Sequence, residues 1–284
     1  MRKKVIVRGP ALSRSGYGEH TRFILRSLRS REDLFDVYLH NVNWGKTGWM
    51  WEENDERAWM DFIMLKTIQY TQNQGQFDIS VQVTIPNEWE KLAPINIGVT
   101  AGIETTKVAP QWIEKSQVVD HIVTISEHSK QTYLDTVYQA QDKRTGEIIN
   151  NFRCTTPIEV VHYPVKEHTP ANLDLELPCE FNFLAVAQIS PRKNMISTIR
   201  WFVEEFIDQE VGLVVKVNTV NNCIPDRIYT ESVLKSILNE YEGRKCRVHL
   251  LHGSMTDEEM TALYQHPNIK ALVTSTHGEG FGLP

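Results

Sequence analysis

The stretch Phe181-Asn182-Phe183-Leu184-Ala185-Val186-Ala187 runs into the polar turn Gln188-Ile189-Ser190-Pro191-Arg192-Lys193-Asn194, and a helical pattern follows. A short apolar run, a turn and then a helix are typical of a parallel α/β sheet with crossover helices. The alternation continues downstream, where we expect further strands at 213–217, 248–251 and 269–274 and helices at 232–241 and after Thr256, with Glu259 completing a capping box.

The first half of the chain shows the same alternation. Prolines 164, 170 and 178 stand among polar residues and mark a boundary near 165–178. We therefore expect two Rossmann-like domains, 1–167 and 175–284, with parallel sheets that face each other across a ligand-binding cleft. The first domain is expected to contain strands at 4–8, 37–39, 77–83, 95–101 and 121–125, and helices at 19–29, 56–72 and 129–138.

Three local expectations can be checked directly. Helix 56–72 is expected to use Trp59, Ile63 and Leu65 on its apolar side. Ser126 is expected to be the N-cap of helix 129–138. The polar stretch 139–157 is expected to be a surface excursion.

Composition excludes several classes of protein. The 284 residues are 41% hydrophobic and 23% charged, with a formal net charge of −6 and no long basic run, so nucleic-acid binding is not expected. Neither a signal peptide nor a membrane span is evident, which favours a cytoplasmic protein and leaves peripheral membrane contact open. The four cysteines lack patterned spacing and the histidines lack metal-ligand spacing, so we expect reduced thiols and no metal.

The last segment, Ser275-Thr276-His277-Gly278-Glu279-Gly280-Phe281-Gly282-Leu283-Pro284, follows a predicted strand. Its glycines let the backbone approach a ligand and point N–H groups at it. The Glu279 carboxylate can accept hydrogen bonds from sugar hydroxyls. The alternative is a tight turn in which the glycines are only conformational.

The string EGFGLP resembles the first half of the Glu-x7-Glu signature of retaining GT-B glycosyltransferases of family four. The resemblance implies that Glu279 contacts the donor sugar, with His277 a further candidate nearby. The second Glu would fall three residues past Pro284, so we expect a second domain cut short inside the motif. The residues implied to line the donor pocket are Gly280, Phe281, Gly282 and Leu283.

The turn 188–194 is the second candidate, because helix N-termini bind anions and a lysine adds a charge-assisted hydrogen bond to a diphosphate. In the resembling family this turn carries an Arg and, five residues later, a Lys. Lys193 matches the Lys, Gln188 stands in place of the Arg, and Arg192 is the candidate to supply the missing charge. The alternative is that Arg192 and Lys193 are solvated surface charges.

The loop Gly9 to Gly18 could cradle a phosphate, but Thr21 replaces the third glycine of a dinucleotide site. The second strand also ends at His40-Asn41, without an acidic residue for a ribose. In the resembling family such a loop approaches the donor diphosphate, a role that Gly16 and Gly18 fit, with Arg14 and His20 as weaker candidates.

The acceptor side is expected near Glu104, in a Glu-Thr segment that precedes Pro110-Gln111-Trp112 and is similar to one in some family members. Glu104 could instead cap the next helix. Trp44, Trp49 and Trp51 could stack on an acceptor sugar or simply pack.

These observations predict a metal-independent, cofactor-free retaining glycosyltransferase of hexosyltransferase type. Its donor is a nucleotide-sugar and its acceptor a carbohydrate or other hydroxyl. Two alternatives stay open at this stage: a non-catalytic nucleotide- or sugar-binding fragment, and an NAD-dependent Rossmann oxidoreductase.

Overall fold

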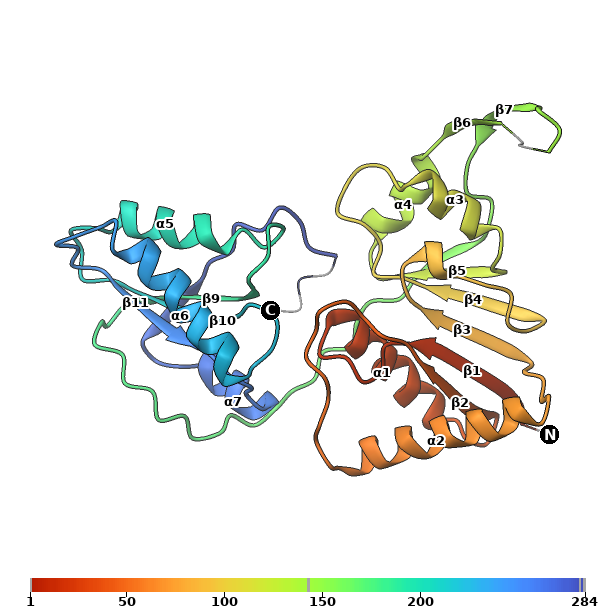
Figure 1. Cartoon of the computed structure of the whole chain (residues 1–284), viewed down its shortest axis with the longest axis horizontal. Helices are drawn as coiled ribbons and strands as arrows, with labels where there is room; N and C mark the ends of the chain where they lie inside the picture. The colour runs from red at the N-terminus through yellow and green to blue at the C-terminus, as the bar shows by residue number, and fades with distance from the viewer. Residues whose placement is uncertain (1, 142–143, 281, 283–284) are drawn as a thin grey trace. The chain divides into compact units, whose positions relative to one another are not determined.

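The computed structural model describes residues 2–141, 144–280 and 282, which form two compact α/β units (Figure 1). The first unit comprises residues 2–164 together with Glu279 and Gly280. The second unit is Val165–Gly278.

The first unit is built on a six-stranded parallel sheet with the order β2-β1-β3-β4-β5-β8. The short β-branched runs of the sequence form its central strands, as predicted. Strand β8, which was not predicted, pairs with β5. The strands are β1 (Lys3–Gly9), β2 (Phe35–Asn41), β3 (Ile79–Val83), β4 (Ile95–Val99), β5 (His121–Thr124) and β8 (Ile158–Val160), and the helices are α1 (Gly16–Arg29), α2 (Asp55–Gln72), the 3₁₀ turn η1 (Pro86–Glu88), α3 (Pro110–Ser116) and α4 (Glu127–Asp135).

Helix α2 packs on β2 through a face that the sequence analysis assigned only in part. Met60, Ile63 and Thr67 are buried, at the i, i+3, i+7 spacing of one helical face. Leu65 was expected on that face, but it lies on the opposite side of the helix and is 61% exposed. That prediction was wrong because residues two apart in a helix point in divergent directions.

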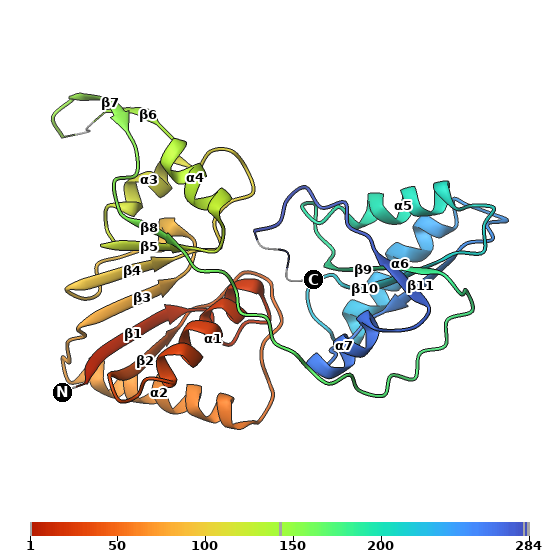
Figure 2. The same cartoon turned by 180° about the vertical axis from the view of Figure 1, so that it is seen from behind.

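The predicted N-cap of helix α4 is confirmed, since the side chain of Ser126 accepts the N–H of Ser129. The helix itself is Glu127–Asp135, so it begins two residues before the predicted start and ends three residues before Tyr138. The Thr136 hydroxyl accepts the N–H of Val108, and Tyr138 donates to the Val108 carbonyl oxygen at 2.7 Å. These bonds draw the chain out of the helix and into an antiparallel hairpin, β6 (Tyr138–Gln141) and β7 (Ile148–Phe152). Figures 1 and 2 show this hairpin standing away from the rest of its own unit.

The second unit has a four-stranded parallel sheet with the order β11-β10-β9-β12. Helix α6 begins at Ile224, eight residues before the predicted start at Ser232, because Pro225 fits the first turn of a helix. The predicted capping box of Thr256 and Glu259 is confirmed. The elements are β9 (Asn182–Gln188), α5 (Met195–Glu205), β10 (Gly212–Asn218), α6 (Ile224–Leu238), β11 (Arg247–Leu251), α7 (Asp257–Tyr264) and β12 (Ile269–Leu272).

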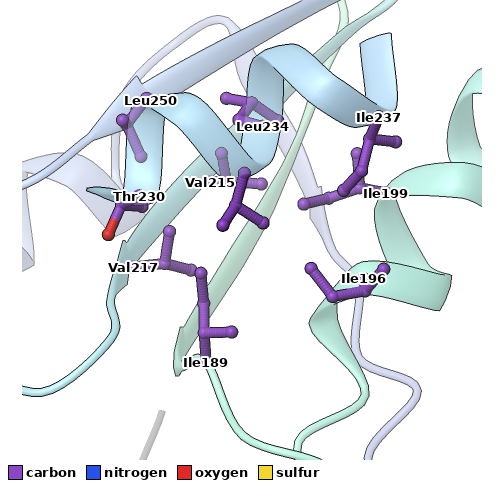
Figure 3. A pocket seen from close by; sticks show the side chains of 10 residues that line it. Ile189, Ile196, Ile199, Val215, Val217, Thr230, Leu234, Ile237 and Leu250 are labelled. Carbon is purple, nitrogen blue, oxygen red and sulfur yellow. The ribbon is translucent and has the colours of Figure 1, made fainter. Parts of the chain in front are cut away.

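A small cavity lies in the core of the second unit, among side chains from α5, α6 and the sheet (Figure 3). Its volume is about 10 Å³, close to the minimum for one water molecule. A nucleotide cannot enter a space of this size, so the cavity belongs to the hydrophobic core. Its lining residues include Ile196, Ile199, Val215, Leu234, Ile237 and Leu250.

Within the described part of the chain, no helix combines the length and the apolar character needed to cross a membrane.

Candidate functional site

The carboxyl ends of the four strands of the second unit lie along one edge of its sheet. Each strand continues there into a loop: 189–194 after β9, 219–223 after β10, 252–256 after β11 and 273–278 after β12. In open parallel sheets this edge is where ligands bind. We therefore take these four loops as the candidate site.

The loops after β9 and β12 are held together at Arg192. The N–H of His277 donates to the Arg192 carbonyl oxygen at 2.9 Å, and the Thr276 hydroxyl donates to the same oxygen at 3.1 Å. The Arg192 guanidinium in turn donates to the carbonyl oxygen of Gly278. The structure thus brings together two predicted donor-site residues, Arg192 and His277, that are far apart in the sequence.

The N-terminus of helix α5 lies directly beside this contact. Its N-cap, Asn194, has a left-handed backbone (φ +52°) and donates from its side chain to the Ser275 carbonyl oxygen at 3.2 Å. The first turn of α5 carries no acidic residue, whereas those of α6 and α7 do. The positive end of the α5 dipole therefore keeps its attraction for an anion, and Arg192 and Lys193 precede it.

Gln188, which stands where the resembling family carries an Arg, connects the end of β9 to the loop after β10. Its side-chain amide donates to the carbonyl oxygen of Thr219 at 2.9 Å. The residue therefore has a structural role at the site edge, between the end of β9 and the loop after β10.

A buried pair that the sequence analysis missed joins the loops after β10 and β11. The Asp226 carboxylate accepts the N–H groups of Thr219 and Val220 at 3.0 Å each and lies 2.9 Å from Nε2 of His252. Burial alone would raise the pKa of this carboxyl, but the bonds from His252 and from the two N–H groups bring it below its ordinary value. Asp226 lies in the first turn of α6. Because the sequence analysis placed the start of this helix at Ser232, it did not identify Asp226 as a residue of the site.

The residues of the EGFG string lie at the end of the described chain. Glu279 and Gly280 group with the first unit. Gly282 has φ +84°, a left-handed conformation that favours glycine. Phe281 and Leu283 lie outside the described residues, and the pairing of Glu279 with Lys193 stays a prediction.

The two glycines of the first-unit loop differ in their surroundings. A Cβ atom on Gly18 would lie 1.9 Å from the carbonyl oxygen of Ser13, so Gly18 is required for the loop to pack on helix α1. Gly16 is exposed, and a Cβ atom there would meet no atom within 4 Å. Of the two, Gly16 is the one with open space for a ligand.

The loop that precedes these glycines is buried and internally bonded. Arg22 donates to the carbonyl oxygens of Ala11 and Ser13, and the Ser13 hydroxyl lies 2.7 Å from that of Thr47. Arg14, a weaker phosphate candidate, pairs with Glu52. These contacts fix the loop before any ligand arrives.

His20, the other weak candidate, is buried rather than turned to a ligand. Its Nδ1 lies 3.1 Å from the hydroxyl of Tyr163, and burial lowers its pKa to about 4. His20 is therefore neutral at pH 7 and part of the core contact between α1 and the segment after β8.

The three tryptophans of the loop after β2 separate into one packed and two exposed side chains. The Trp44 ring lies 4.6 Å from that of Tyr17, centroid to centroid. Trp49 and Trp51 are 46% and 71% exposed. Trp44 thus packs, and Trp49 and Trp51 retain free aromatic surface for stacking.

The acceptor-side candidate Glu104 is exposed and does not cap the next helix. Helix α3 has Ala109 as its N-cap and no side-chain capping bond, so the capping alternative was wrong. Nearby Gly102 has φ +76°, and a Cβ atom there would lie 1.9 Å from the hydroxyl oxygen of Ser129. The backbone conformation and the contact with Ser129 therefore restrict this position to glycine.

Among the described residues, no group of three or more His, Cys, Asp or Glu side chains is arranged to hold a metal ion.

Comparisons with known proteins identify the architecture. No family model matches the chain, and no curated protein matches it in sequence. Solved structures do match over nearly its whole length. The chain has a GT-B-like fold.

Three of these structural neighbours are a galactosyltransferase, a protein in complex with UDP-glucose and a UDP-forming synthase. The lipopolysaccharide outer core galactosyltransferase WaaB matches 99% of this chain and 76% of its own, with a TM-score of 0.54 and 12% identity. Anabaena Alr3699/HepE, in complex with UDP-glucose, matches 97% and 74%, with a TM-score of 0.54 and 11% identity. A trehalose-phosphate synthase from Burkholderia xenovorans matches 98% and 80%, with a TM-score of 0.53 and 10% identity. At these identities the GT-B-like fold is what the likeness shows.

Proposed function

We propose that this protein is a retaining glycosyltransferase that binds the diphosphate of a nucleotide-sugar at the N-terminus of α5. The observation that carries the proposal is the contact at Arg192, which joins the loops after β9 and β12 beside a helix start that lacks acidic residues. Arg192 and Lys193 add positive charge there. Negative charge develops on a diphosphate as it leaves, and fixed cations and N–H groups stabilise such charge.

In the reaction that we propose, the bond between the sugar C1 and the diphosphate oxygen breaks while the acceptor oxygen bonds to C1. The acceptor proton passes to an oxygen of the departing diphosphate, so no protein nucleophile is required. Lys193 and the α5 N–H groups hold the diphosphate, and Glu279 orients the sugar through its hydroxyls. The proposal is supported by the GT-B-like fold and by the UDP-glucose described with one structural neighbour.

The experiment that tests ligand binding uses Cys223, the exposed cysteine of the loop after β10. The other three cysteines are buried, so a maleimide should react first at Cys223. A bound nucleotide-sugar should slow this reaction and raise the melting temperature, because a ligand that binds only the folded state stabilises it. UDP-, GDP- and ADP-sugars should be compared, with NADH as the control.

Protection by one sugar nucleotide and release of its nucleoside diphosphate in the presence of an acceptor would support the proposal. Binding without turnover would favour the non-catalytic alternative. Protection by NADH alone would contradict the proposal.

A further inference from the structure

The hairpin of β6 and β7 forms a small sheet of its own, separate from the six-stranded sheet of its unit. Among the described residues each of its strands pairs with the other alone, in a two-stranded antiparallel sheet. Every residue of β7 except Phe152 is exposed, and Ile148 and Ile149 are 59% and 40% exposed. Figure 2 shows the two strands apart from the main sheet of their unit. Isolated two-stranded sheets are marginally stable in water, and an open strand edge is a template for a further strand.

The sequence of β7 and its flanking residues is complementary to itself when it is read in the opposite direction. In the segment Glu147-Ile148-Ile149-Asn150-Asn151-Phe152-Arg153, an antiparallel pairing centred on Asn150 places Glu147 opposite Arg153 of a second copy. Both residues are exposed. Opposite charges that face each other across two strands stabilise the pairing, and like charges destabilise it.

The inner positions agree with the same register. Ile148 falls opposite Phe152 of the second copy, and aliphatic–aromatic pairs are favourable across strands. Asn150 falls opposite itself, at the twofold axis. A slip by one residue in either direction would lose both charge pairs, so the charge pattern favours one alignment.

We propose that β7 is a self-association surface, at which two copies of this chain pair antiparallel about Asn150 to form a continuous four-stranded sheet. The contact is isologous, because each copy contributes the same segment. A pairing this short buries less area than a standard interface, so we expect a reversible dimer with a Kd of roughly 10 to 100 µM. The proposal is independent of the catalytic function.

The first test uses charge reversal and sedimentation equilibrium over roughly 1 to 500 µM, a range that brackets that Kd. Glu147→Arg places two arginines opposite each other, and Arg153→Glu places two glutamates opposite each other. Each single variant should dimerise at least about tenfold more weakly than the wild-type protein. An equimolar mixture of the two single variants should regain the dimer, because each variant is then complementary to the other. The matched control is Glu114→Arg, a charge reversal at an exposed position of α3.

The second test is a cross-link at the twofold axis. Directly opposed residues in an antiparallel pair have Cα atoms about 4.5 to 5.5 Å apart, which a disulfide can span. Asn150→Cys, in a Cys223→Ser background that removes the native exposed thiol, should form a disulfide-linked dimer on mild oxidation. Gln139→Cys on β6, in the same background, should not.

Three results would overturn the proposal: a wild-type chain that stays monomeric at the highest concentration, a dimer unaffected by either charge reversal, or equal cross-linking at positions 139 and 150. Circular dichroism of each variant verifies that the chain is folded. If a charge variant is unfolded, the cross-linking pair decides.

Discussion

Lys193 is the side chain on which the proposed stabilisation of the departing diphosphate depends most. It lies in the turn before α5, next to Arg192, and no acidic residue stands in the first turn of that helix. A preorganised group that stabilises developing charge typically contributes about 3 to 4 kcal/mol to lowering the barrier.

We expect Lys193→Ala to lower kcat by about 100- to 1000-fold, because this stabilisation is needed mainly in the transition state. The measurement is release of nucleoside diphosphate at saturating donor. The matched control is Lys235→Ala, which removes an exposed lysine from the last turn of α6 and should leave kcat unchanged. Equal rates for the two variants would contradict the role of Lys193.

Two neighbouring glycines allow a paired prediction about the first-unit loop. Gly18→Ala forces a methyl group against the Ser13 carbonyl oxygen and should destabilise the fold by about 1 to 3 kcal/mol. Gly16→Ala should leave stability unchanged, since the added methyl meets no neighbour within 4 Å. Urea denaturation compares the two. If Gly16 also faces the donor, Gly16→Ala should raise the KM for the donor while the fold stays intact.

His20 should make stability depend on pH. Burial lowers its pKa to about 4, against about 6.5 in an unfolded chain, so the unfolded state binds more protons between these values. The contribution of His20 to the free energy of unfolding is therefore fully present above pH 6.5. About 3 kcal/mol of it is lost as the pH falls from 6.5 to 4. In urea titrations His20→Gln should flatten this dependence, and His128→Gln, at an exposed position of α4, should not. A wild-type slope that survives His20→Gln would assign the effect to other groups.

At the scale of elements, the Asp226–His252 pair holds two loops of the second unit in fixed relation. Asp226→Ala would leave two N–H groups and His252 without their shared acceptor. We expect a loss of about 3 kcal/mol in stability, since breaking a buried pair leaves its polar partners uncompensated. Thermal unfolding measures the loss, and Asp257→Asn in the exposed first turn of α7 is the control. An equal loss of stability in the two variants would contradict a stabilising role of the Asp226–His252 pair.

All strands of the two parallel sheets except β8 could be predicted from the sequence, because short β-branched runs bounded by turns are a strong local signal. Strand β8 and the hairpin were missed, since neither carries a long apolar run and both depend on contacts made by Tyr138, Val108 and Ile122. The start of α6 was misplaced because its first turn contains Pro225 and the charged Asp226 and Arg227 rather than an apolar pattern. At the site, the string 188–194 was informative in sequence, whereas the bonds that join it to Thr276 and His277 arise only from the pairing of β9 with β12.

At the scale of the whole molecule, each unit has its own hydrophobic core. The chain between them is exposed at residues 165–167 and 169–170, where Val165 is 89% exposed. His168 is half-buried, and its Nε2 lies 3.5 Å from Oδ2 of Asp257. From Ala171 onward the connection also packs on the second unit. The N–H of Ala171 donates to the carbonyl oxygen of Glu258, and Leu173, Leu175 and Leu177 pack on the core of that unit.

We therefore expect limited digestion with subtilisin to cut within 165–170 and not within 171–178, because proteases cleave exposed chain in preference to chain that is packed on a core. Mass spectrometry of the early fragments measures the position of the cut. Early cleavage at Leu173 or Leu175 would contradict the packing of that segment.

Side-chain hydrogen bonds connect the loops at the carboxyl edge of the second sheet to one another. They are made by Gln188, Arg192, Asn194 and Asp226. Their conformational freedom is lost when the unit folds, not when a ligand arrives. Immobilising a flexible side chain during association costs about 0.5 to 1.5 kcal/mol. A ligand that binds there does not have to order these side chains, so less of its interaction energy is offset by lost conformational entropy.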